Sequence, residues 1–188
     1  MASTDTKQRI LEIARGLVQA QGYNALSFRD IAARLGIKGP AVHHHYPTKG
    51  DLGAALAREY TDSGAEMLEQ LLKTSEDPTV LLDAYVAIFR AALLNGNRMC
   101  LCGIMAAEQE ALPEAVRSEV GRFTDVNIAW LMRVVEMDDP LAGVQKRRQR
   151  ALAMFAAIEG AQLVARGRRD IGLFDNAVIG CRQAGLIP

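Results

Sequence analysis

The sequence has few of the features that mark secreted, membrane-spanning or disulfide-linked proteins. Its three cysteines are an odd number, which argues against a disulfide framework. The first ten residues are polar and lack the apolar core of a secretory signal. Apolar runs such as residues 99–107 are far shorter than the roughly 20 residues that a membrane-spanning helix needs. We therefore expect a cytoplasmic protein with no membrane partner.

Aromatic and β-branched residues are also scarce, which disfavours a sheet-rich fold. Aromatic residues make up 5% of the 188 residues, whereas alanine, leucine, glutamate and arginine are common. These abundant types favour helices over strands. Hydrophobic residues reach 49%, and the length suits one domain of ordinary size or a small domain joined to a larger one. The composition therefore predicts a globular, all-α protein.

The sequence carries no net charge, so its total charge indicates no partner. The distribution is uneven, however. Residues 1–60 carry 8 basic and 5 acidic side chains together with all three histidines, and residues 146–188 carry 8 and 3. The middle, residues 61–145, carries 6 and 14. A polyanion would therefore prefer one end of the molecule.

Signatures of enzymes and metal sites are missing as well. The sequence has no nucleophile elbow, phosphate-binding loop, zinc signature or dinucleotide fingerprint. Three adjacent histidines, residues 43–45, cannot converge on one ion, because successive helical residues turn by about 100°. We expect no enzyme, no metal and no cofactor. A catalytic pair built from Glu108, Glu110 or Cys102 is the enzymatic alternative, which nothing in the sequence favours.

Apolar residues at helical spacing predict helices along the whole chain. Breaks at glycine, proline and asparagine divide them. The expected spans are residues 5–21, 27–36, a very short helix that ends before residue 47, then 48–73, 78–95, 98–111, 113–137, 141–166 and 171–185. Three capping boxes support the first elements: Asp5 with Gln8, Ser27 with Asp30, and Thr48 with Asp51. Gly22 and Gly36 are expected to end helices in the left-handed conformation.

Three short helices with a glycine turn between the second and the third predict a helix-turn-helix unit. In such a unit the third helix exposes donors to the major groove of DNA, and flanking cations meet phosphates. Val42 and Tyr46 are positioned to pack inward. The residues that remain for DNA are Lys38, Gly39, Pro40, Ala41, His43 and His44.

The segment from Leu26 to Ala32 and the segment from Lys49 to Leu52 resemble the DNA-binding signature of the TetR family of one-component transcriptional regulators. The resemblance implies an N-terminal helix-turn-helix domain over residues 1–50. A larger helical domain for effector binding and dimerisation would then occupy residues 51–188. It also implies a repressor that binds a palindromic double-stranded operator as a homodimer through its two C-terminal helices. A small-molecule effector or a thiol-reactive signal would release it.

The resemblance also assigns roles to single residues. His43 occupies the position of a tyrosine that touches phosphate, and Lys49 that of a lysine at the phosphate contact of the fourth helix. Ser27 and Arg29 open the second helix near the DNA backbone, and His44 contacts a base or a phosphate. Gly39 and Pro40 replace more usual polar residues, so the operator sequence does not follow. Because His43 replaces tyrosine, DNA affinity is expected to fall as its imidazole loses a proton.

Apolar stripes in the remainder allow two interpretations. They form a plain core, or, as the resemblance implies, they line an effector pocket. The pocket candidates are Tyr85, Phe89, Cys102, Met105, Trp130 and Phe155. A helical adaptor without a DNA role is a further alternative, but an adaptor would not need exposed donors in residues 27–52.

Cysteines and small residues raise two more questions. Cys100 and Cys102 share the predicted helix 98–111, where they point about 200° apart, so a bond between them is not expected. Each is a small buried hydrophobe or a sensor of electrophiles and oxidants. The basic residues at 146–150 are interpreted as a salt-bridged face. Small residues between 153 and 161 suit a dimer seam with residues 171–185, or a tight internal helix pair.

Overall fold

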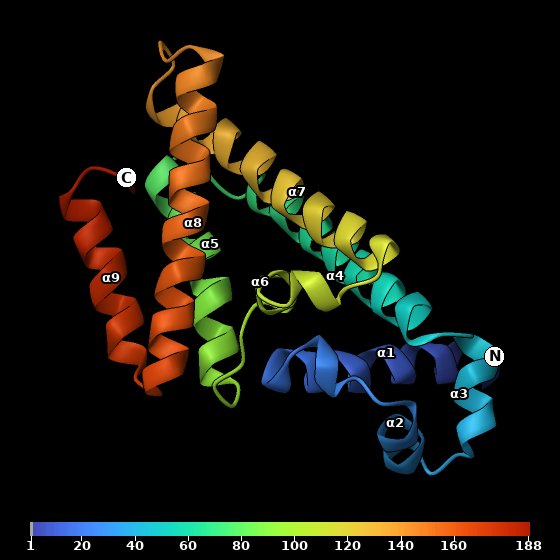
Figure 1. Ribbon diagram of the computed structural model, residues 1–188. Helices are drawn as coiled ribbons and strands as arrows, with labels where there is room; N and C mark the ends of the chain where they lie inside the picture. Colours follow the sequence, from blue (N-terminus) through green and yellow to red (C-terminus); the bar gives the residue numbers. More distant parts are fainter. Residues whose placement is uncertain (1) are drawn as a thin grey trace. The chain divides into compact units, whose positions relative to one another are not determined.

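The computed structural model describes residues 2–188, and the side chains from residue 5 onward (Figure 1). It is 80% helical and contains no strand in this range, so the prediction of an all-α protein is confirmed. The elements are α1 (Ala2–Gln21), η1 (Tyr23–Ala25), α2 (Phe28–Leu35), α3 (Gly39–His45), α4 (Lys49–Leu71), α5 (Pro78–Leu94), α6 (Leu101–Ala106), η2 (Gln109–Ala111), α7 (Glu114–Asp138), α8 (Val144–Arg168) and α9 (Ile171–Gln183). None of these described helices is both long and apolar enough to cross a membrane.

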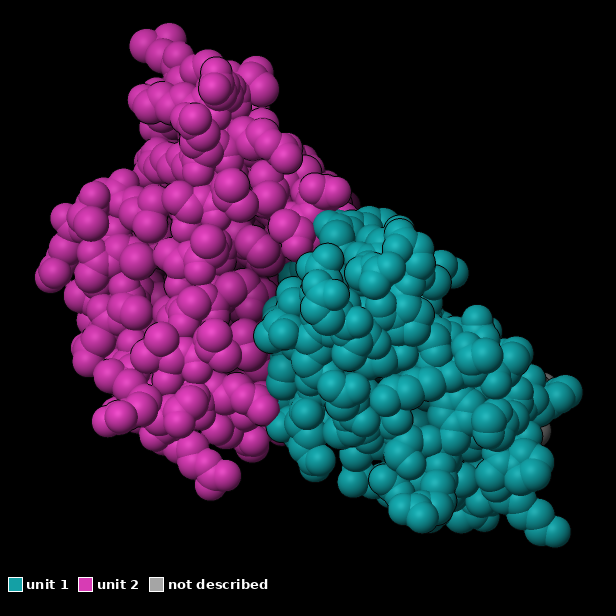
Figure 2. All heavy atoms as spheres, viewed as in Figure 1, with its two compact units in different colours: residues 1–61, 101–123 teal, residues 62–100, 124–188 magenta. Residues whose placement is uncertain are grey.

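The chain forms two compact units (Figure 2). Unit 1 contains residues 1–61 and 101–123, and unit 2 contains residues 62–100 and 124–188. Helices α4 and α7 each contribute residues to both units. These units differ from the expected division at residue 50, because residues 51–61 and 101–123 pack with the N-terminal helices. The functional boundary at residue 50 stays a prediction.

The core of unit 1 is built from the apolar stripes of its helices. The stripe of α1 is buried as its spacing predicts, with Ile10, Ala14 and Val18 fully enclosed. Each large aliphatic side chain buried in this way stabilises the fold by about 1.5–3 kcal/mol. Gly53 on α4 shows how closely the elements approach. A β-carbon there would lie 2.7 Å from the Tyr23 ring and 3.1 Å from Val116.

Unit 2 combines apolar packing with buried polar contacts. Leu81, Leu131 and Phe174 are fully buried. The Trp130 indole N–H donates to the Leu68 carbonyl over 2.8 Å. At the edge, Arg90 donates two hydrogen bonds of 2.8 and 2.9 Å to Asp175, which joins α5 to α9. This pair holds the pKa of Asp175 below its ordinary value, through the hydrogen bond from Arg90.

Three local predictions are wrong in detail. Helix α1 begins at Ala2, so Asp5 lies in its first turn and is not the residue before the helix. Gly22 has a positive φ of 90°, but its ψ of 174° is not left-handed helical. The expected helix 98–111 is shorter and divided into α6 and η2. In the turn between them, the Glu108 N–H donates to the Met105 carbonyl. The side chain of Glu108 contacts Asn24, which lies far away in the sequence.

Candidate nucleic-acid interface

Local sequence signals build the α2–turn–α3 segment. Ser27 precedes α2, and its hydroxyl accepts the Asp30 N–H over 3.3 Å, as expected of a cap. Gly36 ends α2 in the left-handed conformation with φ 68° and ψ 29°, which confirms that prediction. The Ile37 N–H then donates back to the Ala32 carbonyl over 3.1 Å, which completes a Schellman-type ending. The chain therefore turns sharply before α3 begins at Gly39.

Helix α3 has one buried and one exposed face. Val42 and Tyr46 are 0% and 3% exposed, so they pack inward as predicted. Lys38 immediately precedes α3, Gly39, Pro40 and Ala41 form its first turn, and His43 and His44 lie in its last turn. Lys38, Pro40, His43 and His44 are exposed, and Gly39 and Ala41 are half-buried. An exposed face on a short, firmly packed helix is the geometry that groove reading requires.

His43 is held at the end of this face. Its Nδ1 lies 3.2 Å from the Pro47 carbonyl, and its ring meets Phe28 edge-on with centroids 4.5 Å apart. Because a carbonyl only accepts, this contact requires a proton on Nδ1. The neutral ring then leaves Nε2 as an acceptor, which cannot donate to a phosphate. Only the protonated imidazole offers an N–H at Nε2.

Lys49 is engaged inside unit 1. Its Nζ donates to the Asn24 carbonyl over 3.2 Å and lies 4.7 Å from the centre of the Tyr23 ring. An ammonium has three donors, so this bond leaves others for a phosphate. The capping box beside it is complete. The Thr48 N–H donates to Asp51, and the Asp51 N–H donates to the Thr48 hydroxyl, over 3.0 and 3.1 Å.

The two residues predicted to contact DNA at the start of α2 differ in how exposed their side chains are. Ser27 is half-buried, and its hydroxyl oxygen is used by the cap. The Arg29 side chain is 93% exposed, with its Nε 3.7 Å from Asp30. A loose pair of this kind contributes little to stability. Arg29 is therefore free to reorient towards an anion.

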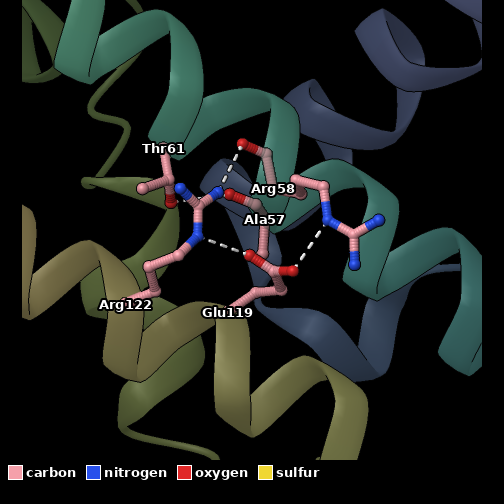
Figure 3. A network of polar contacts seen from close by, with 5 residues as sticks. All are labelled: Ala57, Arg58, Thr61, Glu119 and Arg122. Atoms are coloured by element: carbon pink, nitrogen blue, oxygen red, sulfur yellow. Dashed lines mark hydrogen bonds and ion pairs between the residues drawn. The ribbon is translucent and has the colours of Figure 1, made fainter.

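Sequence reasoning missed a charged network behind the motif (Figure 3). Glu119 on α7 accepts hydrogen bonds from Arg58 on α4 over 2.7 Å and from Arg122 over 2.9 Å. Burial raises the pKa of Glu119, but the hydrogen bonds from Arg122 and Arg58 outweigh it and hold that pKa below its ordinary value. The Glu119–Arg122 pair is visible as an i, i+3 spacing. Arg58 is 61 residues away, so no local signal indicates it.

Glu108, considered above as a catalytic residue, has a structural contact in unit 1. One of its carboxylate oxygens accepts the Asn24 N–H over 3.0 Å. A β-carbon on Gly22 would lie 1.7 Å from the other oxygen. The carboxylate thus occupies the space that a side chain at residue 22 would need. Glu108 connects the segment after α6 to η1, at the base of the helix-turn-helix.

The predicted pocket residues belong to both compact units. In unit 2, Tyr85 stacks on Trp130 and also contacts Phe89, with ring centroids 5.1 Å apart in both pairs. The fourth aromatic candidate, Phe155, is also buried there. Cys102 and Met105 are buried in unit 1. We call the rings of Tyr85, Phe89 and Trp130 the aromatic cluster.

The structure corrects the interpretation of the two neighbouring cysteines. Cys100 precedes α6 and belongs to unit 2, whereas Cys102 lies in α6 within unit 1. The two thiols therefore do not share a helix, and the predicted angle between them does not apply. They are 2% and 1% exposed. No group of three potential metal-ligating side chains occurs in the part of the chain that the structure describes.

Three of the four basic residues at positions 146–150 are paired, as the salt-bridge interpretation predicts. Lys146 bonds to Asp139 over 3.0 Å, and Arg150 bonds to Asp138 over 2.5 Å. The Lys146 hydrogen bond holds the pKa of Asp139 below its ordinary value. Arg147 likewise pairs with Glu136. These cations belong to a salt-bridged face.

Comparison with known proteins agrees with this geometry. The family model described as bacterial regulatory proteins, tetR family, matches residues 10–56. A TetR family regulator from Agrobacterium tumefaciens is 30% identical with a TM-score of 0.87, covering 93% of this chain and 94% of that one. A TetR transcriptional regulator from Legionella pneumophila is 30% identical with a TM-score of 0.89, covering 97% of each chain. An uncharacterised HTH-type transcriptional regulator from Mycobacterium tuberculosis is 26% identical, covering 90% of this chain and 88% of that protein.

Proposed function

The protein belongs to the TetR family of DNA-binding transcriptional regulators, and from this premise we propose that it is a homodimeric repressor of a palindromic operator. An effector that binds its helical second part would release it from DNA. The observation that carries the proposal is the exposed face of α3, from Lys38 to His44, above the buried Val42 and Tyr46. The donors of this face are available to DNA without any change in packing.

The chemistry of this face limits how it reads bases. Gly39, Pro40 and Ala41 carry no side-chain donor, so Lys38 and His44 supply the hydrogen bonds to base edges. Pro40 and Ala41 suit apolar contact with thymine methyl groups. Ser27, Arg29, His43 and Lys49 contact phosphates, which position the helix without reading sequence.

Exposed apolar residues on the last two helices support a dimer. Leu152, Leu163 and Val164 on α8 are 49%, 54% and 57% exposed, and Ile179 on α9 is 51% exposed. The small residues Ala153, Ala156 and Gly160 are exposed on α8 as well. Large apolar side chains gathered on a surface mark an interaction site, and small residues allow helices to approach closely. A two-fold dimer would place two α3 helices on two half-sites about one DNA turn apart.

The effector site is proposed in the helical part after residue 50, with Tyr85, Phe89, Trp130 and Phe155 as its aromatic residues in unit 2. Burial of both thiols disfavours a thiol-reactive signal, so we favour a non-covalent effector. An effector that prefers a different geometry of the dimer shifts the population away from the DNA-binding form. In unit 1, the Glu108–Asn24 contact connects residues after α6 to the base of the helix-turn-helix.

A mobility-shift titration with DNA from upstream of the protein's own gene tests the proposal. Affinity should fall steeply as salt rises, because phosphate contacts release counterions. Lys49→Ala should weaken binding to operator and random DNA alike, whereas Lys73→Ala, on an exposed residue beyond α4, should not. Thermal unfolding of both variants separates lost contacts from lost folding. Binding that is independent of salt would contradict the proposal.

A further inference from the structure

Glu159 on α8 is an unusual residue of unit 2. Both of its carboxylate oxygens are buried, and neither accepts a hydrogen bond from a nitrogen or oxygen donor among the described residues. A carboxylate removed from water without donors is costly, because it loses its hydration and gains nothing in return. Such groups in folded proteins call for an explanation, and a missing ligand is one.

The neutral polar side chains buried in the same unit form hydrogen bonds with other groups. The Tyr85 hydroxyl donates to the Asn127 side chain over 2.8 Å. The Gln162 amide donates to the Phe89 carbonyl and accepts the Cys100 N–H, each over 2.8 Å. Each of these bonds joins groups other than Glu159.

The remaining neighbours define the surroundings of the carboxylate. Burial raises the pKa of Glu159 to about 7, and the Cys100 thiol, a weak donor, opposes this only in part. The pKa of Tyr85 is raised well above its ordinary value, first by burial and then by the charge of Glu159. Glu159 therefore acts on Tyr85, which stacks on Trp130 in the aromatic cluster.

We propose that Glu159 anchors the effector and that the effector is an amphipathic amine. The ammonium group would donate hydrogen bonds to the Glu159 carboxylate, and its apolar part would lie against the aromatic cluster. An ionised, buried carboxylate needs an opposite charge as well as a donor, which an alcohol does not supply. Aromatic faces also attract cations. This inference rests on the proposed function, because it names the ligand class of the effector site.

Trp130 provides a direct reporter of binding. It is the only tryptophan of the protein, and its ring lies 5.1 Å from Tyr85. Three probes share one apolar part and differ in charge: 4-phenylbutylamine, 4-phenyl-1-butanol and 4-phenylbutyrate. In fluorescence titrations near pH 8, the amine should bind about tenfold tighter than the alcohol, because it forms a charge-assisted hydrogen bond. The anionic butyrate should bind more weakly than both.

Two variants test whether the preference for amine over alcohol depends on the Glu159 carboxylate. Glu159→Gln should abolish the preference for amine over alcohol, whereas Glu76→Gln, on an exposed residue, should retain it. Circular dichroism and the Trp130 emission without probe report folding, and Glu159→Met serves if the glutamine variant does not fold. The inference is overturned if no probe binds the wild type, if the alcohol or the butyrate binds as tightly as the amine, or if folded variants at residue 159 keep the preference.

DNA binding of the same samples keeps the two proposals apart. Operator binding without amine binding would reject the amine site and leave the repressor proposal standing. Amine binding without any DNA binding would support the site and contradict the repressor proposal.

Discussion

The helix-turn-helix and unit 2 are stabilised by polar contacts of different range. In the helix-turn-helix, the capping pairs Ser27–Asp30 and Thr48–Asp51 join residues three apart. In unit 2, Tyr85 bonds to Asn127 across 42 residues, and Gln162 bonds to Phe89 across 73. Local bonds shape an exposed surface for DNA, whereas distant bonds organise a buried interior. The comparison indicates that DNA binding and the proposed effector sensing depend on separable sets of interactions.

The largest effect is expected where long-range bonds are removed. Gln162 is fully buried and bonds to two backbone groups. Gln162→Leu leaves the Cys100 N–H unpaired, whereas the Phe89 carbonyl loses one bond and keeps its place in the ladder of α5. At roughly 1–3 kcal/mol for the unpaired N–H and about 1 kcal/mol for the other bond, the free energy of unfolding should fall by about 3 kcal/mol. Chemical denaturation measures the change. Gln183→Leu, on an exposed residue, is the control. An equal loss of unfolding free energy in both variants would contradict the conclusion that long-range bonds stabilise unit 2.

The raised pKa of Glu159, a residue of unit 2, predicts that the stability of the folded protein depends on pH. Its pKa is about 7 in the folded protein against 4.5 ordinarily, so between these values the folded state holds a proton that the unfolded chain has lost. Stability should therefore fall as pH rises from about 4.5 to 7, by about 3 kcal/mol in total. Glu159→Gln should remove this slope and be the more stable protein at about pH 8.

Denaturation curves across this pH range test the assignment. If Glu159→Gln loses stability with rising pH as steeply as the wild type, another group is responsible.

Substituting alanine for two glycines of unit 1 with positive φ should destabilise the protein to different extents. At Gly36, φ is 68° and an added β-carbon meets nothing within 4 Å, so Gly36→Ala should cost only about 1 kcal/mol of backbone strain. At Gly22, φ is 90° and the β-carbon would displace Glu108 from Asn24. Its ψ of 174° also places Gly22 in a region that only glycine adopts readily, so Gly22→Ala should cost more, about 3 kcal/mol. Thermal unfolding measures both costs, and equal values would contradict this prediction.

The smallest effect concerns the DNA-binding face. Because Nδ1 of His43 is held by the Pro47 carbonyl, only its protonated ring donates to phosphate. His43→Phe, which keeps an aromatic ring beside Phe28 but has no donor, should weaken operator binding about threefold. His43→Tyr carries a hydroxyl donor and should retain the affinity. Fluorescence anisotropy with labelled DNA measures both variants, and equal affinities would exclude His43 as a phosphate contact.

Most features that depend on neighbours along the chain were predicted correctly, although the Asp5 cap and the left-handed Gly22 were not. The caps at Ser27 and Thr48, the left-handed Gly36 and the inward Val42 and Tyr46 all follow from spacing of three or four residues. The division of the expected helix 98–111 into α6 and η2 was not predicted, because the Glu108 contact with Asn24 joins residues that are 84 apart in sequence. For the same reason, nothing local indicates that Lys49 donates to the Asn24 carbonyl.

The sequence alone determined the all-α class, the positions of most helices and the residues on the exposed face of α3. These properties follow from backbone geometry and short-range hydrogen bonds. Only the tertiary structure decided that Arg58 joins Glu119, that Cys100 and Cys102 belong to different units, and that the Glu159 carboxylate is buried with no donor stronger than a thiol. Burial and the loss of hydration depend on every element that packs around a side chain, and the spacing of residues along one helix does not contain that information.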